Sequence, residues 1–139
     1  MGLITAKLEL LNSGDYYNFQ DGKLSEPDIR KVNVDALVDT GAYMFCINDQ
    51  IKNQLGLKVL SIETAEMANG EINSFEVVGP VMIKFKNRQT ICRAFVMPGD
   101  SQVLLGSIPM EDMDVIINPK SQTMEVNPLH PYLAQKSLK

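Results

Sequence analysis

The stretch that decides the fold is Ala36-Leu37-Val38-Asp39-Thr40-Gly41-Ala42-Tyr43-Met44. Its apolar beginning is typical of a buried strand, and Asp-Thr-Gly is a combination that favours a tight turn. The pattern predicts one carboxylate, that of Asp39, at the tip of a rigid strand, where it could activate a water molecule. The sequence contains this triplet once and has no Asp-Ser-Gly. Because the triplet alone is also an ordinary turn, its meaning depends on the surrounding chain.

The segments on either side of this turn have regular patterns. Residues 31–38 alternate between apolar and polar side chains and predict a strand that leads into the turn, and residues 43–47 predict a short strand that leaves it. A two-turn helix is expected next, over residues 48–56. Asn48 can cap its first turn, Asp49 suits the positive end of the helix dipole, and Gly56 can end it in the left-handed conformation.

Two hairpins follow. Residues 58–68 and 71–78 predict strands joined at Asn69-Gly70, which is a strong hairpin signal. Gly79-Pro80 is expected to break the chain. Residues 81–86 and 89–96 predict a second hairpin across Asn87-Arg88.

The remaining segments complete a set of short strands. Strands are predicted over residues 4–10, 115–118 and 123–126, with an apolar segment over 103–106, a helical turn over 107–113 and a long loop over 12–27. In that loop, Tyr16, Tyr17 and Phe19 could cover the edge of a sheet or form a partner site, and we favour the first. Many short strands with close turn signals predict an all-β barrel or sandwich with one or two short helices.

Composition excludes several classes of protein. The 139 residues suit one domain with a real core, and the net charge of −4 disfavours a nucleic-acid partner. No apolar run is long enough to cross a membrane, and the N-terminus lacks the pattern of a signal peptide, so we expect a cytoplasmic protein. Cys46 and Cys92 are expected to be free thiols rather than a disulfide. Together with the lone His130 they offer neither a catalytic pair nor the spacing of a metal site.

The order of these features resembles the retropepsin-like family, the single-lobed, retroviral-type aspartic proteases of clan AA. The resemblance covers residues 6–126 and depends on Leu37-Val38-Asp39-Thr40-Gly41-Ala42, Leu104-Leu105-Gly106 and Val115-Ile116-Ile117-Asn118-Pro119. It implies an all-β, closed barrel with a β-hairpin flap. Residues 1–127 would be the protease domain and residues 128–139 a C-terminal tail, which we expect to be poorly ordered.

The resemblance also implies roles for particular residues. Asp39 would be the catalytic aspartate of an endopeptidase that hydrolyses peptide bonds, and Thr40, Gly41 and Ala42 would complete the active-site turn. The family uses two carboxylates that share one proton, so a chain with one Asp-Thr-Gly would act on its peptide or protein substrate as a homodimer, with no cofactor or metal. The resemblance assigns the flap and the supporting loop beneath the turn to Met67, Ala68, Asn69, Gly70, Glu71, Leu104, Leu105 and Gly106.

Two features depart from the retroviral pattern. Tyr43 and Met44 stand where retroviral members have acidic residues, and Gly70 is the only glycine of the flap. A non-catalytic binding or dimerisation module with the same barrel is therefore an alternative. A third interpretation is an unrelated β-barrel in which the turn is accidental.

Overall fold

The computed structural model describes residues 3–138, which form a seven-stranded sheet, a two-stranded sheet and four short helices. The strands are β1 (Thr5–Asn12), β2 (Lys31–Val38), β3 (Phe45–Asn48), β4 (Lys58–Glu66), β5 (Ile72–Phe85), β6 (Arg88–Met97), β7 (Leu104–Leu105), β8 (Val115–Asn118) and β9 (Thr123–Val126). The helices are α1 (Ser13–Gln20), the 3-10 helix η1 (Glu26–Asp28), α2 (Asp49–Leu55) and α3 (Ser107–Met113).

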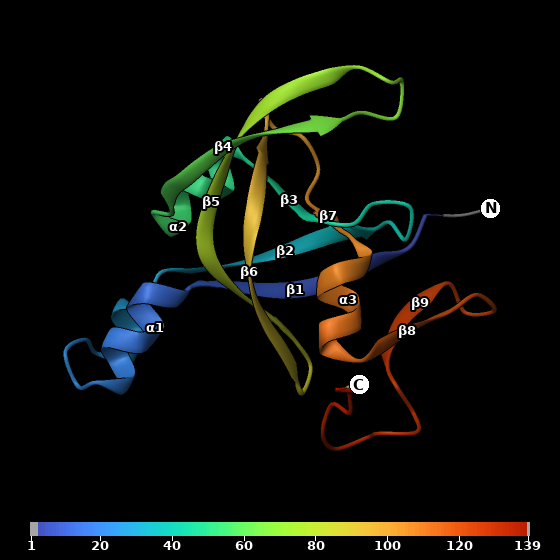
Figure 1. Cartoon of the computed structure of the whole chain (residues 1–139). Coiled ribbons are helices and arrows are strands. Elements are labelled where there is room, and N and C mark those ends of the chain that lie inside the picture. Colours follow the sequence, from blue (N-terminus) through green and yellow to red (C-terminus); the bar gives the residue numbers. More distant parts are fainter. Residues whose placement is uncertain (1–2, 139) are drawn as a thin grey trace.

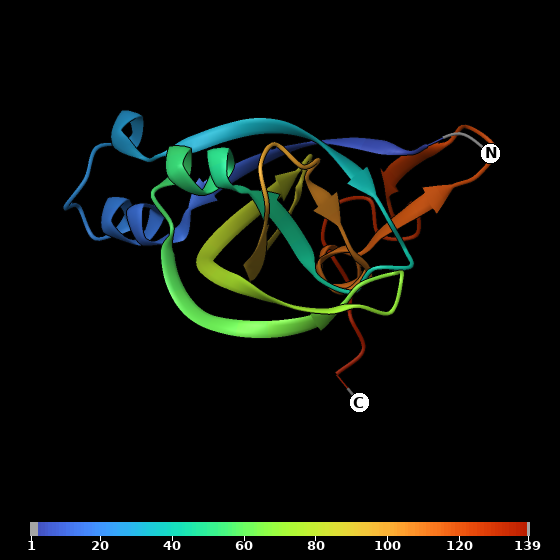
Figure 2. The same ribbon diagram turned by 90° about the horizontal axis from the view of Figure 1, so that it is seen from above.

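The large sheet closes on itself, as the prediction of an all-β barrel requires. Its strand order is β1-β2-β7-β3-β6-β5-β4, and β1 also pairs with β5. The first half of β5 pairs with β4 and its second half pairs with β1. The β4–β5 hairpin therefore extends beyond the closed part of the sheet and projects above it (Figures 1 and 2).

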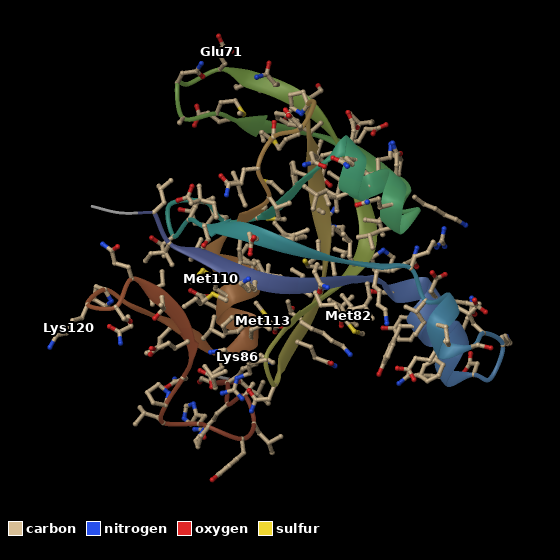
Figure 3. The ribbon with its side chains drawn as sticks, turned by 180° about the vertical axis from the view of Figure 1, so that it is seen from behind. Glu71, Met82, Lys86, Met110, Met113 and Lys120 are labelled. Carbon is tan, nitrogen blue, oxygen red and sulfur yellow. The ribbon has the colours of Figure 1, made fainter. Side chains whose placement is uncertain are left out.

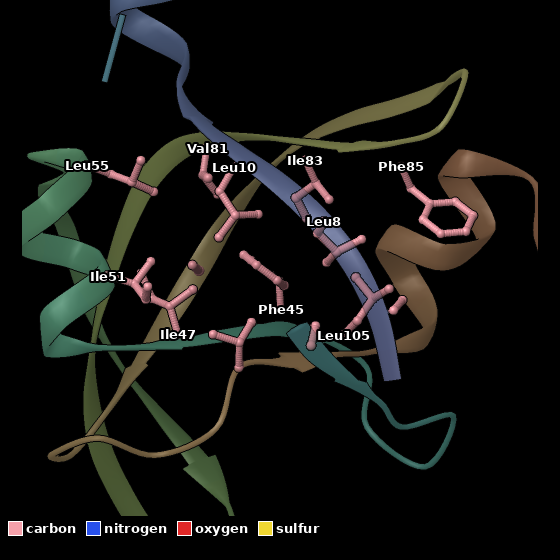
Figure 4. Packing of buried hydrophobic residues seen from close by; sticks show 14 of the residues in the cluster. Leu8, Leu10, Phe45, Ile47, Ile51, Leu55, Val81, Ile83, Phe85 and Leu105 are labelled. Carbon is pink, nitrogen blue, oxygen red and sulfur yellow. The ribbon is translucent and has the colours of Figure 1, made fainter. Parts of the chain in front are cut away.

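The interior of the closed sheet is filled by large apolar side chains. Leu8 and Leu10 from β1, Phe45 and Ile47 from β3, and Leu105 from β7 are almost completely buried. They converge on one another from different strands (Figure 4). Burying each such side chain stabilises the fold by about 1.5–3 kcal/mol, so this cluster fixes the strands that carry the Asp39 turn.

Helix α2 forms as the sequence predicts. The Asn48 side chain accepts a hydrogen bond from the Ile51 backbone N–H at 2.9 Å, and Gly56 ends the helix with φ of 60°. The predicted strands over residues 31–38, 115–118 and 123–126 and the helix over residues 107–113 are also confirmed.

The segment expected to be a long loop contains a helix instead. In α1, the Asn12 side chain accepts a hydrogen bond from the Asp15 backbone N–H at 3.0 Å, and its amide donates to the Leu55 carbonyl at 2.8 Å. Asp15 also holds Arg30 through an ion pair of 2.8 Å. These contacts stabilise a helix that has no apolar periodicity to indicate it. Tyr16 and Phe19 pack against Leu11 and Met82 on the paired strands β1 and β5, whereas Tyr17 is 49% exposed, so only two of the three aromatic residues cover the sheet.

The expected break at Gly79-Pro80 is wrong. Strand β5 runs through these residues, and its pairing register with β6 shifts between Val78 and Val81. A bulge accommodates a proline, which cannot donate to a ladder, without ending the strand. The turn of the next hairpin also lies one residue earlier than predicted, at Lys86-Asn87, and β6 begins at Arg88.

The C-terminal tail is held against the body of the protein rather than lacking contacts. The Asn87 side chain donates to the Pro131 carbonyl at 2.9 Å, and His130 bonds to Asp114 at 2.7 Å. Figure 1 shows this segment beyond α3, away from the flap. Within residues 3–138, no helix is long and apolar enough to cross a membrane.

Candidate active site

The two-residue strand β7 positions the Asp39 turn. β7 lies between β2 and β3, parallel to β2 with Val38 opposite Leu105 and antiparallel to β3 with Phe45 opposite Leu105. The chain therefore leaves β2 on one side of β7 and returns as β3 on the other. Residues 39–44 make this crossing, so the segment that follows Val38 is held by two strand pairings at once.

The Asp39 side chain is fixed within this turn. The Asp39 backbone N–H donates to the Leu105 carbonyl at 3.0 Å, and the Ala42 N–H donates to the Asp39 carbonyl at 3.1 Å. The carboxylate oxygen Oδ1 accepts a hydrogen bond from the Gly41 N–H at 3.0 Å. Within residues 3–138, no donor contacts Oδ2. The half-buried carboxylate is thus oriented by one oxygen while the other is available to a ligand.

The residues after β7 support the turn from below. The Ser107 N–H donates to the Ala42 carbonyl at 2.9 Å, and the Ile108 N–H donates to the Tyr43 carbonyl at 3.0 Å. A Cβ atom on Gly106 would lie 2.4 Å from the Met44 carbonyl oxygen. Only glycine allows this approach, so the structure brings the Leu104-Leu105-Gly106 segment against the turn as the sequence suggested.

The Met67–Glu71 segment forms the tip of the projecting β4–β5 hairpin. The Met67 N–H donates to the Glu71 carbonyl at 2.7 Å, the Gly70 N–H donates to the Met67 carbonyl at 2.9 Å, and Gly70 has φ of 87°. In both Figure 1 and Figure 2 the tip overhangs the turn between β2 and β3, and Figure 3 shows Glu71 pointing outward at the tip. The hairpin tip and the Asp39 turn, distant in the sequence, therefore face each other.

A groove of about 520 Å³ opens beside the hairpin, between it and the segment that joins β6 to β7. Asp39 does not line it. The sequence did not predict this groove. The turn residues of Met97-Pro98-Gly99-Asp100 did indicate a loop before β7, and part of that loop lines the groove. The groove is lined by five apolar, two acidic and three uncharged polar residues: Met67, Phe75, Val96, Met97, Pro98, Asp49, Glu76, Asn73, Ser74 and Ser101.

The cysteines are free thiols, as expected from the sequence. Burial, and to a lesser extent the negative charge of Asp39, raise the pKa of the Cys46 thiol. Burial also raises the pKa of Cys92 to about 12. His130 bonds to Asp114 in the tail. These thiols are therefore protonated at neutral pH, which disfavours a cysteine nucleophile.

Comparisons with known proteins agree with this geometry. Residues 26–110 match the model of the family described as "gag-polyprotein putative aspartyl protease". Among solved structures, the fold is similar to that of the retroviral protease-like domain of Ddi1 from Leishmania major, with a TM-score of 0.57 and 13% identity over 92% of this chain and 90% of that one. No curated protein matches the sequence.

Proposed function

The chain belongs to the gag-polyprotein aspartyl protease family, and from this premise we propose that it is an aspartic endopeptidase that acts as a homodimer. The observation that carries the proposal is the state of Asp39. Its carboxylate stands at the end of a strand whose Ala36 and Val38 are buried, is oriented through Oδ1 by the Gly41 N–H, and has no donor on Oδ2 among residues 3–138. This is the arrangement that a water-activating carboxylate needs.

The proposed mechanism uses two Asp39 carboxylates that share one proton. Two carboxyl groups about 3 Å apart cannot both ionise readily, and aspartic proteases rely on this effect. The ionised member removes a proton from a water molecule, which attacks the carbonyl carbon of the peptide. The protonated member donates a hydrogen bond to the carbonyl oxygen. A proton then passes to the leaving amine as the C–N bond breaks.

A second copy of the chain would supply the second carboxylate. The sequence has one Asp-Thr-Gly, so a two-fold axis through the turn is the arrangement that brings two such carboxylates together. Thr40 and Gly41 are exposed in the structure and so are accessible to a partner. We assign to the Thr40 hydroxyl a hydrogen bond that locks one turn to the other.

The hairpin and the groove would bind the substrate. With its tip over the Asp39 turn, the Met67–Glu71 segment would act as the flap that covers a bound peptide. Met67 lines both the tip and the groove, which makes it the flap residue that we assign to substrate contact. The apolar residues that line the groove suit a large apolar side chain of the substrate.

The decisive experiment compares Asp39→Asn with the wild type on a mixed peptide library, from acid to neutral pH, with cleavage products identified by mass spectrometry. Asn can still accept the Gly41 N–H, so the turn and the fold should persist. We expect cleavage to fall by about two to four orders of magnitude, the contribution of a positioned general acid or base. The matched control is Asp35→Asn, an exposed aspartate of the same strand, which should leave cleavage unchanged.

Equal turnover by wild type and Asp39→Asn would refute the assignment. Absence of cleavage by a wild type that still dimerises would favour the alternative, a binding or dimerisation module that keeps the barrel.

A further inference from the structure

One acidic side chain in the groove beside the hairpin has no partner in the part of the chain that the structure describes. Asp49 and Glu76 both line this groove. The Glu76 carboxylate is paired with the Lys52 ammonium at 2.7 Å. Asp49 is exposed, and among residues 3–138 no hydrogen bond or ion pair reaches its carboxylate. The groove therefore presents one negative charge that no direct contact within the chain neutralises.

The backbone that carries Asp49 is held in place by contacts of the preceding residue. The Asn48 side chain donates to the Ser101 carbonyl at 2.8 Å and accepts from the Ile51 N–H at 2.9 Å. Ser101 lies in the segment between β6 and β7, which faces the hairpin across the groove. The start of α2 is thus fixed against one wall of the groove, and little ordering of the backbone is needed when a ligand reaches the carboxylate.

The rest of the groove suits a side chain with a long apolar stem. Half of its lining residues are apolar, among them Met67 at the hairpin tip and Pro98 in the facing segment. Its volume of about 520 Å³ is in the range of pockets that hold a drug-sized ligand, so it has room for more than one side chain. Lysine and arginine carry a cationic head on an apolar stem, and they therefore match both the apolar lining and the free carboxylate of Asp49.

The charge around the groove favours the same kind of ligand. Residues 58–78, which contain the projecting hairpin, include four glutamates and one lysine. Arg93 of β6 pairs with only one of these glutamates, Glu63, at 2.6 Å. In Figure 1, α2 lies at the base of the hairpin, so Asp49 extends this acidic surface. A surface of one sign attracts ligands of the opposite charge.

We propose that Asp49 is a specificity-determining residue that selects a lysine or arginine of the peptide substrate, beside the apolar side chain that the groove accepts. The proposal rests on the proposed function, because it concerns the substrate of the same site. The stem of the basic side chain contacts the apolar lining, and its ammonium or guanidinium group pairs with the Asp49 carboxylate.

The test uses a mixed peptide library and measures both retention on the immobilised protein and cleavage, with peptides identified by mass spectrometry. A sequence selected by the wild type is then synthesised with lysine, norleucine or glutamate at the position enriched in basic residues. Norleucine keeps the apolar stem and lacks the charge. Asp49 also suits the positive end of the α2 dipole, so its replacement lowers stability slightly in any case. A ratio between two peptides on one variant does not depend on that loss.

Asp49→Asn is expected to lower the ratio of kcat/KM for the lysine peptide over the norleucine peptide by about threefold to fivefold, the value of an exposed ion pair. The change should lie in KM, since the pair forms before the chemical step. Asp49→Glu should keep the preference, and Asp49→Lys should shift it to the glutamate peptide. The matched control is Asp100→Asn, because Asp100 lies in the segment facing the hairpin but does not line the groove. It should keep the wild-type ratio.

The two measurements distinguish this proposal from the proposed function. A library in which no position is enriched in lysine or arginine would overturn the role of Asp49, whether or not peptides are cleaved. So would an enrichment that Asp49→Asn leaves unchanged. Retention of basic peptides that requires Asp49, without any cleavage, would support the binding role of Asp49 and refute the peptidase assignment alone.

Discussion

Two aspartates near opposite ends of the short helix α3 differ in how their carboxylates are satisfied. Asp39, at the end of β2, accepts one hydrogen bond, from Gly41. Asp114, at the end of α3, accepts hydrogen bonds from the Asn127 side chain at 3.0 Å and the Gln135 N–H at 2.9 Å, and it bonds to His130 at 2.7 Å.

The comparison separates a structural carboxylate from the one proposed to be catalytic. The hydrogen bonds to Asp114, led by the Gln135 backbone N–H and the Asn127 side chain, lower its pKa from the ordinary 3.8 to about 2. The ionised Asp114 carboxylate interacts with three donors, which hold the tail and leave it less acceptor capacity for a water molecule. Asp39 has that capacity, and its rigidity comes from the backbone around it rather than from donors to its side chain.

The largest effect on stability is expected from a substitution of Gly106, because this residue packs against the turn that holds Asp39. In Gly106→Ala the new methyl group would meet the Met44 carbonyl oxygen at 2.4 Å and the Tyr43 carbonyl carbon at 2.6 Å. Overpacking of this kind costs about 1–3 kcal/mol, and here it would also displace the turn. We expect a lower free energy of unfolding in urea and a loss of peptidase activity larger than the loss of folded protein.

Ser107→Ala is the neighbouring control for Gly106→Ala. Ser107 contacts the turn through its backbone N–H, which the substitution keeps. If Gly106→Ala matched Ser107→Ala in both stability and activity, the turn would not depend on close packing from below.

The parts of this site that follow local rules could be predicted from the sequence. The strand before Asp39, the Asn48 cap of α2 and the Asn69-Gly70 hairpin are each specified by a few neighbouring residues. Helix α1 was missed because its stability comes from contacts across the chain, from Asn12 to Leu55 and from Asp15 to Arg30, and not from apolar periodicity.

The long-range arrangement could not be predicted for the same reason. No local pattern indicates that β7 inserts between β2 and β3, or that Asp114 gathers donors from a tail rich in proline and polar residues. The groove beside the hairpin is likewise formed by segments far apart in the sequence. The family resemblance pointed to Asp39 because the proposed active-site turn is a short contiguous motif, whereas features assembled from distant segments have no such motif.

A smaller loss of stability is expected from a substitution of Asp114. Asp114→Asn keeps a residue that tolerates the observed φ of 54°, but it weakens the acceptor for three donors and leaves the buried Arg88 guanidinium, 3.7 Å away, without a carboxylate. We expect a lower Tm at pH 7 with peptidase activity retained below that temperature. The exposed loop variant Asp100→Asn should keep the wild-type Tm.

The pH dependence of that difference tests the cause. Because the folded-state pKa of Asp114 is depressed, its contribution to stability is fully present above 3.8 and is lost as the pH falls from 3.8 through 2. The Tm difference between wild type and Asp114→Asn should therefore shrink across this range. A difference that stayed constant down to pH 2 would mean that the ionised carboxylate does not hold the tail.

The smallest expected effect is on the alkylation rate of Cys46, whose thiol pKa depends in part on the negative charge of Asp39. The Cys46 thiol has its pKa raised by burial and then by the negative charge of Asp39, whereas the Cys92 pKa is raised by burial and then by Asp112. At pH 8, Asp39→Asn should increase alkylation of Cys46 by iodoacetamide by less than about tenfold and leave Cys92 unchanged. Asp112→Asn should do the reverse.

Measuring both cysteines in both variants distinguishes a local change of charge from a general opening of the structure. Faster alkylation of both cysteines in one variant would report general opening of the structure, whereas a response confined to one cysteine reports the local charge. If Cys46 ignored Asp39→Asn while Cys92 responded to Asp112→Asn, the assay would be sensitive enough, and the negative charge of Asp39 would not contribute to the raised pKa of Cys46.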